Sequence, residues 1–390
     1  MNAAVLPTVR DVITSAEVIV CCGSGGVGKT TIAAIIGLEL ARSGRRVVVI
    51  TIDPAKRLAD ALGVADGLGN EPVRIATNPG ERSGDRSGSG ELWAAMLDPA
   101  ATFDMLVHQT APSPERAERI LSNRFYRNIA GALSGTQEYM AAERLYALHD
   151  DPRFDAVVVD TPPSQHALDF IDAPGTLARF LDHAVFKLMM VPARRGLRVL
   201  NVAAQPVLRS IGKVVGGDVL ADAIGFFQAF EGMESGFRDR AVAVTALLRS
   251  EQTRFVLVAS PKRDTIDEAA FLAARLGDSA LAVDALIVNR STPVFARPRA
   301  ARKKADAALW ENFTELTALA ESERAQVQPF VEQLARQDAG HTAGADAEPV
   351  EGQGDPVALA WVPLLGDDIH DLDALEQIRG LLFGTTAPAG

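Results

Sequence analysis

The stretch Val18-Ile19-Val20-Cys21-Cys22-Gly23-Ser24-Gly25-Gly26-Val27-Gly28-Lys29-Thr30-Thr31 decides the fold of this chain. Its first four residues form an apolar run that predicts a buried strand, and Ile32 to Ala41 predict a helix. Between strand and helix, Gly23 to Thr30 satisfy the phosphate-loop pattern G-x-x-x-x-G-K-[ST]. A plain tight turn is the alternative, but the complete pattern between a strand and a helix favours phosphate binding.

Each part of this loop has a predicted role. Its glycines let backbone N–H groups turn inward and form an anion-binding nest, at which the N-terminus of the following helix also points. Lys29 would bridge the β- and γ-phosphate oxygens, and the hydroxyl of Thr30 would hold Mg²⁺. The predicted phosphate-contacting residues are Gly23, Ser24, Gly25, Gly26, Val27, Gly28, Lys29, Thr30 and Thr31.

Two later strands end in acidic residues. The β-branched run 45–52 leads to Asp53, and because ligands collect at the carboxyl ends of parallel strands, we expect Asp53 near the phosphates. The run 154–160 is apolar and ends in Asp160, which is the Walker B pattern of an aspartate that orders Mg²⁺, usually through water. The polar loop 161–166 would then lie beside the γ-phosphate and move on hydrolysis.

The order of elements predicts the fold class α/β, with a doubly wound, mainly parallel sheet. We expect strands at 18–22, 46–52, 92–97, 154–159, 254–259, 282–288 and 357–362, alternating with helices. Residues 1–390 are expected to form a single domain, with an added helical layer or subdomain at roughly 100–149 and 176–250. Segment 78–90 is predicted to be a flexible loop, and segment 338–355 is predicted to be a disordered loop. Residues 265–268 are predicted to form a capping box that opens a helix, and residues 299–337 are predicted to form an exposed helical hairpin.

Composition narrows the class of protein. The 390 residues are 47% apolar and 23% charged, as in an ordinary globular protein, and the net charge of −11 argues against a general nucleic-acid binder. The two cysteines, Cys21 and Cys22, are adjacent, so we expect no disulfide framework and a reducing compartment. Neither a signal peptide nor an apolar membrane span is seen, which predicts a cytoplasmic location.

Three features stay open on the residues alone. Asn289, at the end of the strand 282–288, fits either an amide that reads the adenine edge or a turn residue. The Met-bearing run 186–191 fits either a deformable partner groove or ordinary helix packing. The arginines at 194, 195 and 198 fit either contact with anionic lipid or a solvated face.

Three motifs in order resemble the ArsA/Get3 ATPases, the arsenite-pump and tail-anchored-protein-targeting members of the deviant-Walker P-loop class. These motifs are 23–31, Asp53-Pro54-Ala55, and Asp160-Thr161-x-Pro163-Ser164-x-His166. The resemblance implies the P-loop NTPase fold, ATP and Mg²⁺ as cofactors, and a dimer with nucleotides near the subunit interface. It also implies that Asp53 and Lys29 are catalytic, Asp53 by orienting the attacking water, that Thr30 and Asp160 serve the metal, and that Asn289 contacts adenine.

The departures from this family pattern are as informative as the matches. The signature loop has a second lysine, which reaches the partner's phosphates, where this chain has Ser24. Either hydrolysis is slow, or another cation such as Lys56 or Arg57 substitutes, or the partner is a different chain that carries the missing charge. The second switch also differs, with Pro162 and Gln165 in place of small residues.

Neither arsenite binding nor an interfacial zinc is expected. Arsenite needs a cluster of soft thiolates, whereas Cys21 and Cys22 lie side by side in a strand and face opposite ways. A C-x-x-C pair for zinc is absent from the sequence.

The leading hypothesis is therefore a Mg²⁺-dependent, ATP-hydrolysing dimeric switch, coupled to an unknown client or membrane partner. The alternative is a weakly active, nucleotide-dependent scaffold that forms a hetero-oligomer with a second ArsA-like chain. A third hypothesis is membrane-surface targeting through residues 186–198.

Overall fold

A computed structural model describes residues 7–55, 57–65, 67–76, 90–124, 136–163, 169–176, 179, 222, 225–226, 230–295, 305–342, 357–366 and 371–384. Almost all of the predicted loop 78–90 and much of the predicted segments 176–250 and 338–355 lie outside these residues. The run 186–198, with its methionines and arginines, lies outside them as well. Tertiary contacts divide the chain into two units, the first being 1–96, 148–168 and 249–390, and the second 97–147 and 169–248.

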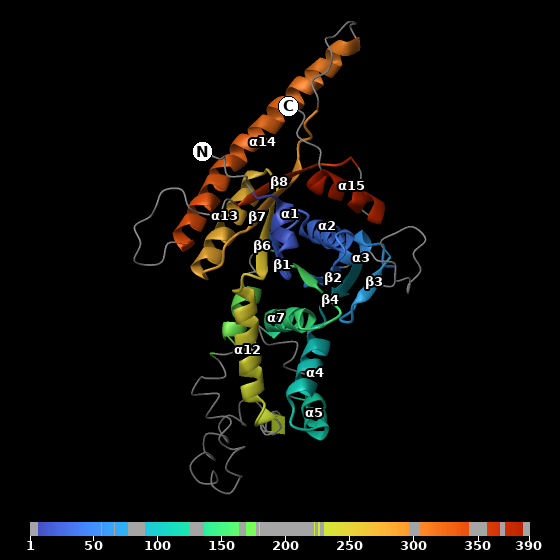
Figure 1. Cartoon of the computed structure of the whole chain (residues 1–390), viewed down its shortest axis with the longest axis vertical. Coiled ribbons are helices and arrows are strands. Elements are labelled where there is room, and N and C mark those ends of the chain that lie inside the picture. The colour runs from blue at the N-terminus through green and yellow to red at the C-terminus, as the bar shows by residue number, and fades with distance from the viewer. Residues whose placement is uncertain are drawn as a thin grey trace. The chain divides into compact units, whose positions relative to one another are not determined.

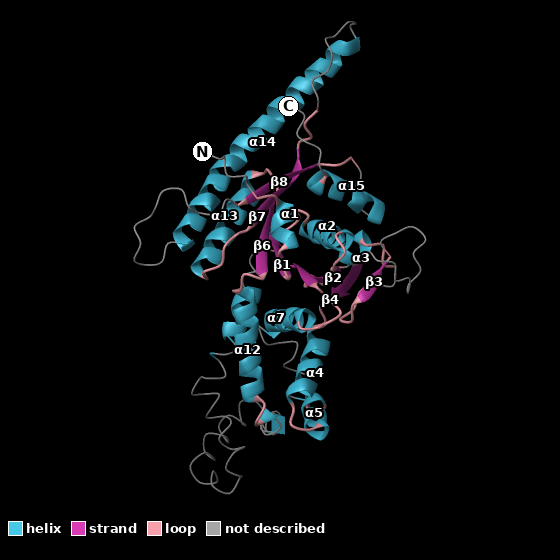
Figure 2. Cartoon of the chain, viewed as in Figure 1, coloured by secondary structure: helices cyan, strands magenta, loops and turns pink. Residues whose placement is uncertain are grey.

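The first unit is built on an eight-stranded sheet, drawn in magenta in Figure 2. Its strands are β1 (Val18–Gly23), β2 (Arg46–Thr51), β3 (Val73–Ile75), β4 (Glu91–Met96), β5 (Ala156–Asp160), β6 (Thr253–Ala259), β7 (Ala285–Ser291) and β8 (Ala358–Pro363). They lie in the order β3-β4-β2-β5-β1-β6-β7-β8, and every neighbouring pair is parallel except β3 and β4 (Figure 1). The predicted doubly wound, mainly parallel sheet is thus confirmed.

Helices pack on this sheet because its central strands are apolar on both faces. All residues of β1 and β5 are buried, and helix α2 (Lys29–Arg42) packs against β1, β2, β4 and β5. Helix α13 (Arg263–Asp278) packs against β6 and β1, and α15 (Leu372–Phe383) against α2 and β8. The short helices α1 (Val9–Thr14) and α3 (Arg57–Ala61) complete the described part of the layers together with α14 (Ala305–Thr342). Burial of both sheet faces is what a parallel sheet requires.

One strand was not predicted from the sequence. Strand β3 has three residues, pairs antiparallel with β4 at the edge of the sheet, and leaves 42% of Val73 exposed. Three residues are too few to show the alternation of apolar and polar residues that predicts a strand. Pairing with β4, and not a pattern in its own sequence, holds β3 in the sheet.

The predicted helical hairpin at 299–337 is wrong. Residues 305–342 form one continuous helix, α14, which passes through Pro329 and runs into the segment predicted to be disordered. Ala320, Val327, Phe330 and Leu334 are buried at helical spacing, so a single apolar stripe continues through the proline. Because this stripe packs against α13, tertiary contact outweighs the tendency of proline to end a helix.

The predicted capping box at 265–268 is also wrong. Helix α13 begins at Arg263, with Lys262 as its N-cap, so Thr265 already lies in the first turn. The Thr265 hydroxyl lies 2.9 Å from the carbonyl oxygens of Ser260 and Lys262 and bonds backwards to the strand end instead of capping the helix.

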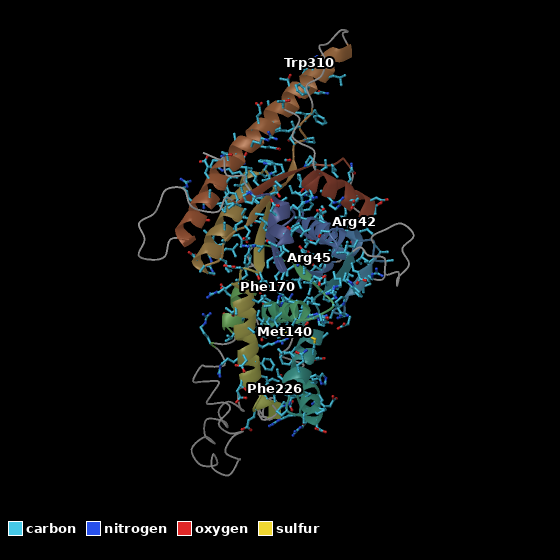
Figure 3. The ribbon with its side chains drawn as sticks, viewed as in Figure 1. Arg42, Arg45, Met140, Phe170, Phe226 and Trp310 are labelled. Atoms are coloured by element: carbon cyan, nitrogen blue, oxygen red, sulfur yellow. The ribbon has the colours of Figure 1, made fainter. Side chains whose placement is uncertain are left out.

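The second unit consists of helices in its described part. They include α4 (Pro99–Thr110), α5 (Pro114–Leu121), most of α7 (Thr136–His149) and α12 (Glu234–Leu248). Its core holds Met140, Phe230 and Phe237, and Figure 3 labels Met140 together with Phe226, which packs against this core. The fully buried carboxylate of Glu143 accepts a hydrogen bond of 2.7 Å from the Arg240 guanidinium, whose charge compensates it. None of the described helices is long and apolar enough to cross a bilayer.

Candidate functional site

The glycine-rich loop joins the central strand β1 to helix α2, and two of its glycines have no substitute. Gly23 has φ 152°, and a Cβ there would lie 2.1 Å from the carbonyl oxygen of Val258. Gly28 is the N-cap of α2 with φ 93°, a left-handed conformation that side chains rarely adopt. Gly25 and Gly26, between them, are exposed to solvent. The chain therefore makes the sharp strand-to-helix turn that a phosphate-binding nest requires.

Lys29 is the first residue of α2 and lies inside this loop. Its side chain is buried, with 7% of the residue exposed, and its Nζ donates a hydrogen bond of 2.7 Å to the carbonyl oxygen of Ser24. Burial lowers the pKa of Lys29, while the nearby Asp160 carboxylate acts against that shift. The ammonium group is thus held within the loop, where an anion would exchange for the Ser24 carbonyl.

Asp160, at the end of β5, is fully buried and receives two hydroxyl groups on one oxygen. Thr30 donates to Oδ2 at 2.8 Å and Thr51 donates to the same atom at 2.9 Å. The second carboxylate oxygen, Oδ1, is buried and has no hydrogen-bond partner among the residues that the structure describes. Burial raises the pKa of Asp160 to about 6, against the two hydroxyl bonds and the Lys29 charge, which lower it.

The sheet register explains why these groups meet. In the β2–β5 pairing Thr51 lies opposite Asp160, and in the β1–β5 pairing Cys21 lies opposite Asp160. The carboxyl ends of three neighbouring parallel strands therefore deliver the loop, Thr51 and Asp160 to one edge. Sequence reasoning missed Thr51, although a polar residue at the end of the apolar run Val47–Ile50 was a signal for it.

The residues present suit a magnesium ion. Mg²⁺ prefers hard oxygen ligands, and the site offers the hydroxyl of Thr30 and the carboxylate of Asp160. An unpartnered buried carboxylate oxygen is costly, so Asp160 Oδ1 has a lone pair to give to a cation or its water.

Asp53 lies beyond the end of β2, beside this cluster. Its backbone N–H donates to Thr51 Oγ1 at 3.2 Å, which links it through Thr51 to Asp160. Its carboxylate is partly exposed, accepts the N–H of Ala55 at 3.0 Å and lies 3.6 Å from Arg57. Arg57 is 65% exposed, so this ion pair leaves the carboxylate open to water. Lys56, the other candidate cation, lies outside the described residues.

Ser24 gives the loop a neutral, buried side chain at the position that the resemblance assigns to a second lysine. Only 2% of Ser24 is exposed, and within the described part of the chain its hydroxyl has no hydrogen-bond partner. Pro163, at the start of the predicted second switch, lies 4.0 Å from where a Cβ of Gly25 would be. The rest of that switch, with Ser164, Gln165 and His166, lies outside the described residues.

The structure gives Asn289 two hydrogen bonds, of which one reaches the loop. Asn289 is 8% exposed, and its Nδ2 donates at 2.8 Å to the carbonyl oxygen of Val27. Its Oδ1 accepts the backbone N–H of Arg290 at 2.9 Å. Contact with adenine stays a prediction, and it would require the amide to share or exchange these partners.

Both cysteines are buried inside the sheet. Burial raises the pKa of Cys22 to about 12 and raises that of Cys21 well above its usual value, so both are neutral thiols at physiological pH. Soft metal ligands are thiolates, and neither sulfur offers one here.

Comparison with known proteins gives one family. The family model described as anion-transporting ATPase matches residues 16–314. A putative arsenical pump-driving ATPase 1 of Aquifex aeolicus is 25% identical over 95% of this chain and 80% of its own length. An ATPase GET3 of Rhodotorula glutinis is 27% identical over 69% of this chain and 68% of its length. With an ATPase GET3 of Malassezia globosa the chain shares 30% identity, over 45% of this chain and only 48% of that relative.

Proposed function

Because the chain belongs to the anion-transporting ATPase family, we propose that it binds ATP with Mg²⁺ at the loop 23–31 and hydrolyses it. The observation that carries this proposal is the convergence of Thr30 and Thr51 on one oxygen of Asp160, whose other oxygen is buried and has no partner in the described ranges. A buried carboxylate with a spare lone pair is costly to keep, and a cation at that place compensates it.

The residues then have distinct tasks. Lys29 leaves the Ser24 carbonyl and binds phosphate oxygens, and the backbone N–H groups of the loop hold the remaining negative charge. A bound magnesium ion would neutralise charge on the β- and γ-phosphates, held by Thr30 and, through water, by Asp160. Asp53 orients the attacking water, because it lies at the same sheet edge with a solvent-accessible carboxylate.

We also propose that the chain acts as a cytoplasmic dimer whose nucleotide state is coupled to a client or membrane partner. Support comes from relatives whose names describe pump-driving and GET3 ATPases. The neutral Ser24 favours a second candidate, in which the chain is a weakly active scaffold and a second ArsA-like chain supplies the missing charge. In a homodimer of this chain, position 24 brings no cation to the partner's phosphates.

Exchange of Asp53 for asparagine tests the catalytic assignment. Asp53→Asn is expected to lower the steady-state rate of phosphate release by about 100-fold or more, because a neutral amide orients the attacking water less firmly than a carboxylate does. The affinity for Mg–ATP, measured by calorimetry, should change less than threefold. The matched control is Asp60→Asn, the same chemical change on the exposed face of α3, which should leave the rate unchanged. A variant that hydrolyses ATP at the original rate would remove Asp53 from the mechanism.

A self-sufficient homodimer and a hetero-oligomer with a second ArsA-like chain differ in what they need for ATP hydrolysis. Phosphate release and molar mass are measured for the purified chain with and without Mg–ATP, and again with a second ArsA-like chain that carries the signature lysine. Turnover by the chain alone, lost in Asp53→Asn, would dismiss the scaffold. Turnover only in the mixture would dismiss the self-sufficient homodimer.

A further inference from the structure

Asn289 connects two parts of the chain that are far apart in sequence. Its Nδ2 bonds to the carbonyl oxygen of Val27, 262 positions away, and this bond is buried. Both ends of its amide are engaged, because Arg290 donates its N–H to Oδ1. The orientation of the amide follows from these partners, since a carbonyl requires a donor and an N–H requires an acceptor.

The hydrogen bond to Val27 fixes the orientation of a whole peptide group. A trans peptide is planar, so its C=O and N–H point in opposite directions. Holding the Val27 carbonyl against Asn289 therefore turns the N–H of Gly28 away from Asn289. That N–H belongs to the run of loop amides that the phosphate-binding pattern uses, and an inverted peptide would present an oxygen in its place.

The local geometry is built around this contact. A Cβ on Gly28 would lie 2.4 Å from Asn289 Nδ2, so only glycine leaves space for the amide. On the other side, the β7–β8 register is irregular between Asn289 and Ser291, and Arg290 has φ 59°. Such bulges redirect a side chain at a strand end.

The next turn of chain is also anchored. Thr292 donates its backbone N–H and its hydroxyl to the Glu323 carboxylate of α14, at 2.7 and 2.9 Å. The strand end that carries Asn289 is therefore held from both directions, by β8 and by α14.

We propose that Asn289 is a positioning residue for the phosphate loop, which acts through the Val27–Gly28 peptide and is required for binding polyphosphate even without a base. The inference rests on the proposed function, since it assumes that the loop binds phosphate. It differs from adenine recognition, in which Asn289 would affect only ligands that carry the base.

The test compares a ligand with a base to one without. Binding of Mg–ATP and of Mg–tripolyphosphate to the full chain is measured by calorimetry for the wild type, Asn289→Ala and Asn289→Asp. Both variants should weaken both ligands by about tenfold or more, the factor that corresponds to the loss of one buried hydrogen bond. Aspartate keeps the shape of asparagine but cannot donate to Val27, so it serves as the second variant if alanine fails to fold. Binding of Mg–GTP is measured as well. The ratio of ATP to GTP affinity should be the same in the variants as in the wild type, because the proposed role of Asn289 does not involve the base.

Ser291→Ala is the matched control. It removes another buried hydrogen bond of β7, at 3.2 Å to the carbonyl oxygen of Val362, without touching the loop. It should leave both affinities within about threefold. Tripolyphosphate binding that falls less than about threefold in the Asn289 variants overturns the inference, whatever happens to ATP. If the wild type binds neither ligand, the proposed function itself fails, and the inference with it.

Discussion

Replacement of Lys29 by alanine is expected to abolish ATP binding at micromolar nucleotide and all measurable hydrolysis. Lys29 is 93% buried within the loop, since 7% of it is exposed, and it is the loop's cation. A hydrogen bond to a charged group contributes about 1.5–3 kcal/mol, so loss of bonds to two phosphate oxygens weakens binding by roughly 10²–10⁴-fold. Calorimetric titration with Mg–ATP measures this directly.

The same substitution has a second effect, on Asp160. The Lys29 charge lowers the pKa of Asp160 against burial, so its removal should raise that pKa further. Lys262→Ala, at an exposed position before α13, is the control for loss of one lysine and should bind as the wild type does. Binding of ATP by Lys29→Ala within tenfold of the wild type would contradict the loop assignment.

Asp160→Asn is expected to separate stability from function. Without nucleotide or metal at pH 7.5, the variant should unfold at the same temperature as the wild type or higher, whereas stabilisation by Mg–ATP should be lost. Burial raises the pKa of Asp160 from 3.8 to about 6, so ionisation in the folded chain costs about 3 kcal/mol at 1.36 kcal/mol per unit. Asparagine keeps an oxygen for the two threonine hydroxyls, and its unpaired NH₂ costs about 1–3 kcal/mol, so the two effects balance or favour the variant.

The difference in stability between Asp160→Asn and the wild type should depend on pH. A carboxyl whose folded pKa is raised contributes stability that is fully present below its unfolded pKa near 3.8 and is lost as the pH rises through about 6. The unfolding temperature of the wild type should therefore fall relative to Asp160→Asn between pH 4.5 and pH 7.5. Thermal unfolding at both pH values measures this difference, with Asp60→Asn as the control for an exposed carboxylate. A variant that is several degrees less stable at pH 7.5 would show that Asp160 is a structural acceptor and not a strained metal ligand.

Local sequence patterns predicted much of the fold. The loop 23–30 needs particular residues at particular spacings, and apolar runs that end in Asp53 or Asp160 identify buried strands at a sheet edge. These signals are local because each depends only on neighbours within one strand, turn or helix. Such reasoning did not predict the short edge strand β3 or the path of α14 through Pro329, because contacts with other elements hold both in place.

The sequence by itself determined a phosphate loop between strand and helix, the acidic strand ends, and a mainly parallel sheet. Only the tertiary structure decided that Thr51 shares Asp160 with Thr30, and that Asn289 holds the Val27 carbonyl. Those contacts depend on strand order and register, which join residues more than 100 positions apart. No local pattern encodes such pairings, since the free energy that selects them comes from packing the whole sheet.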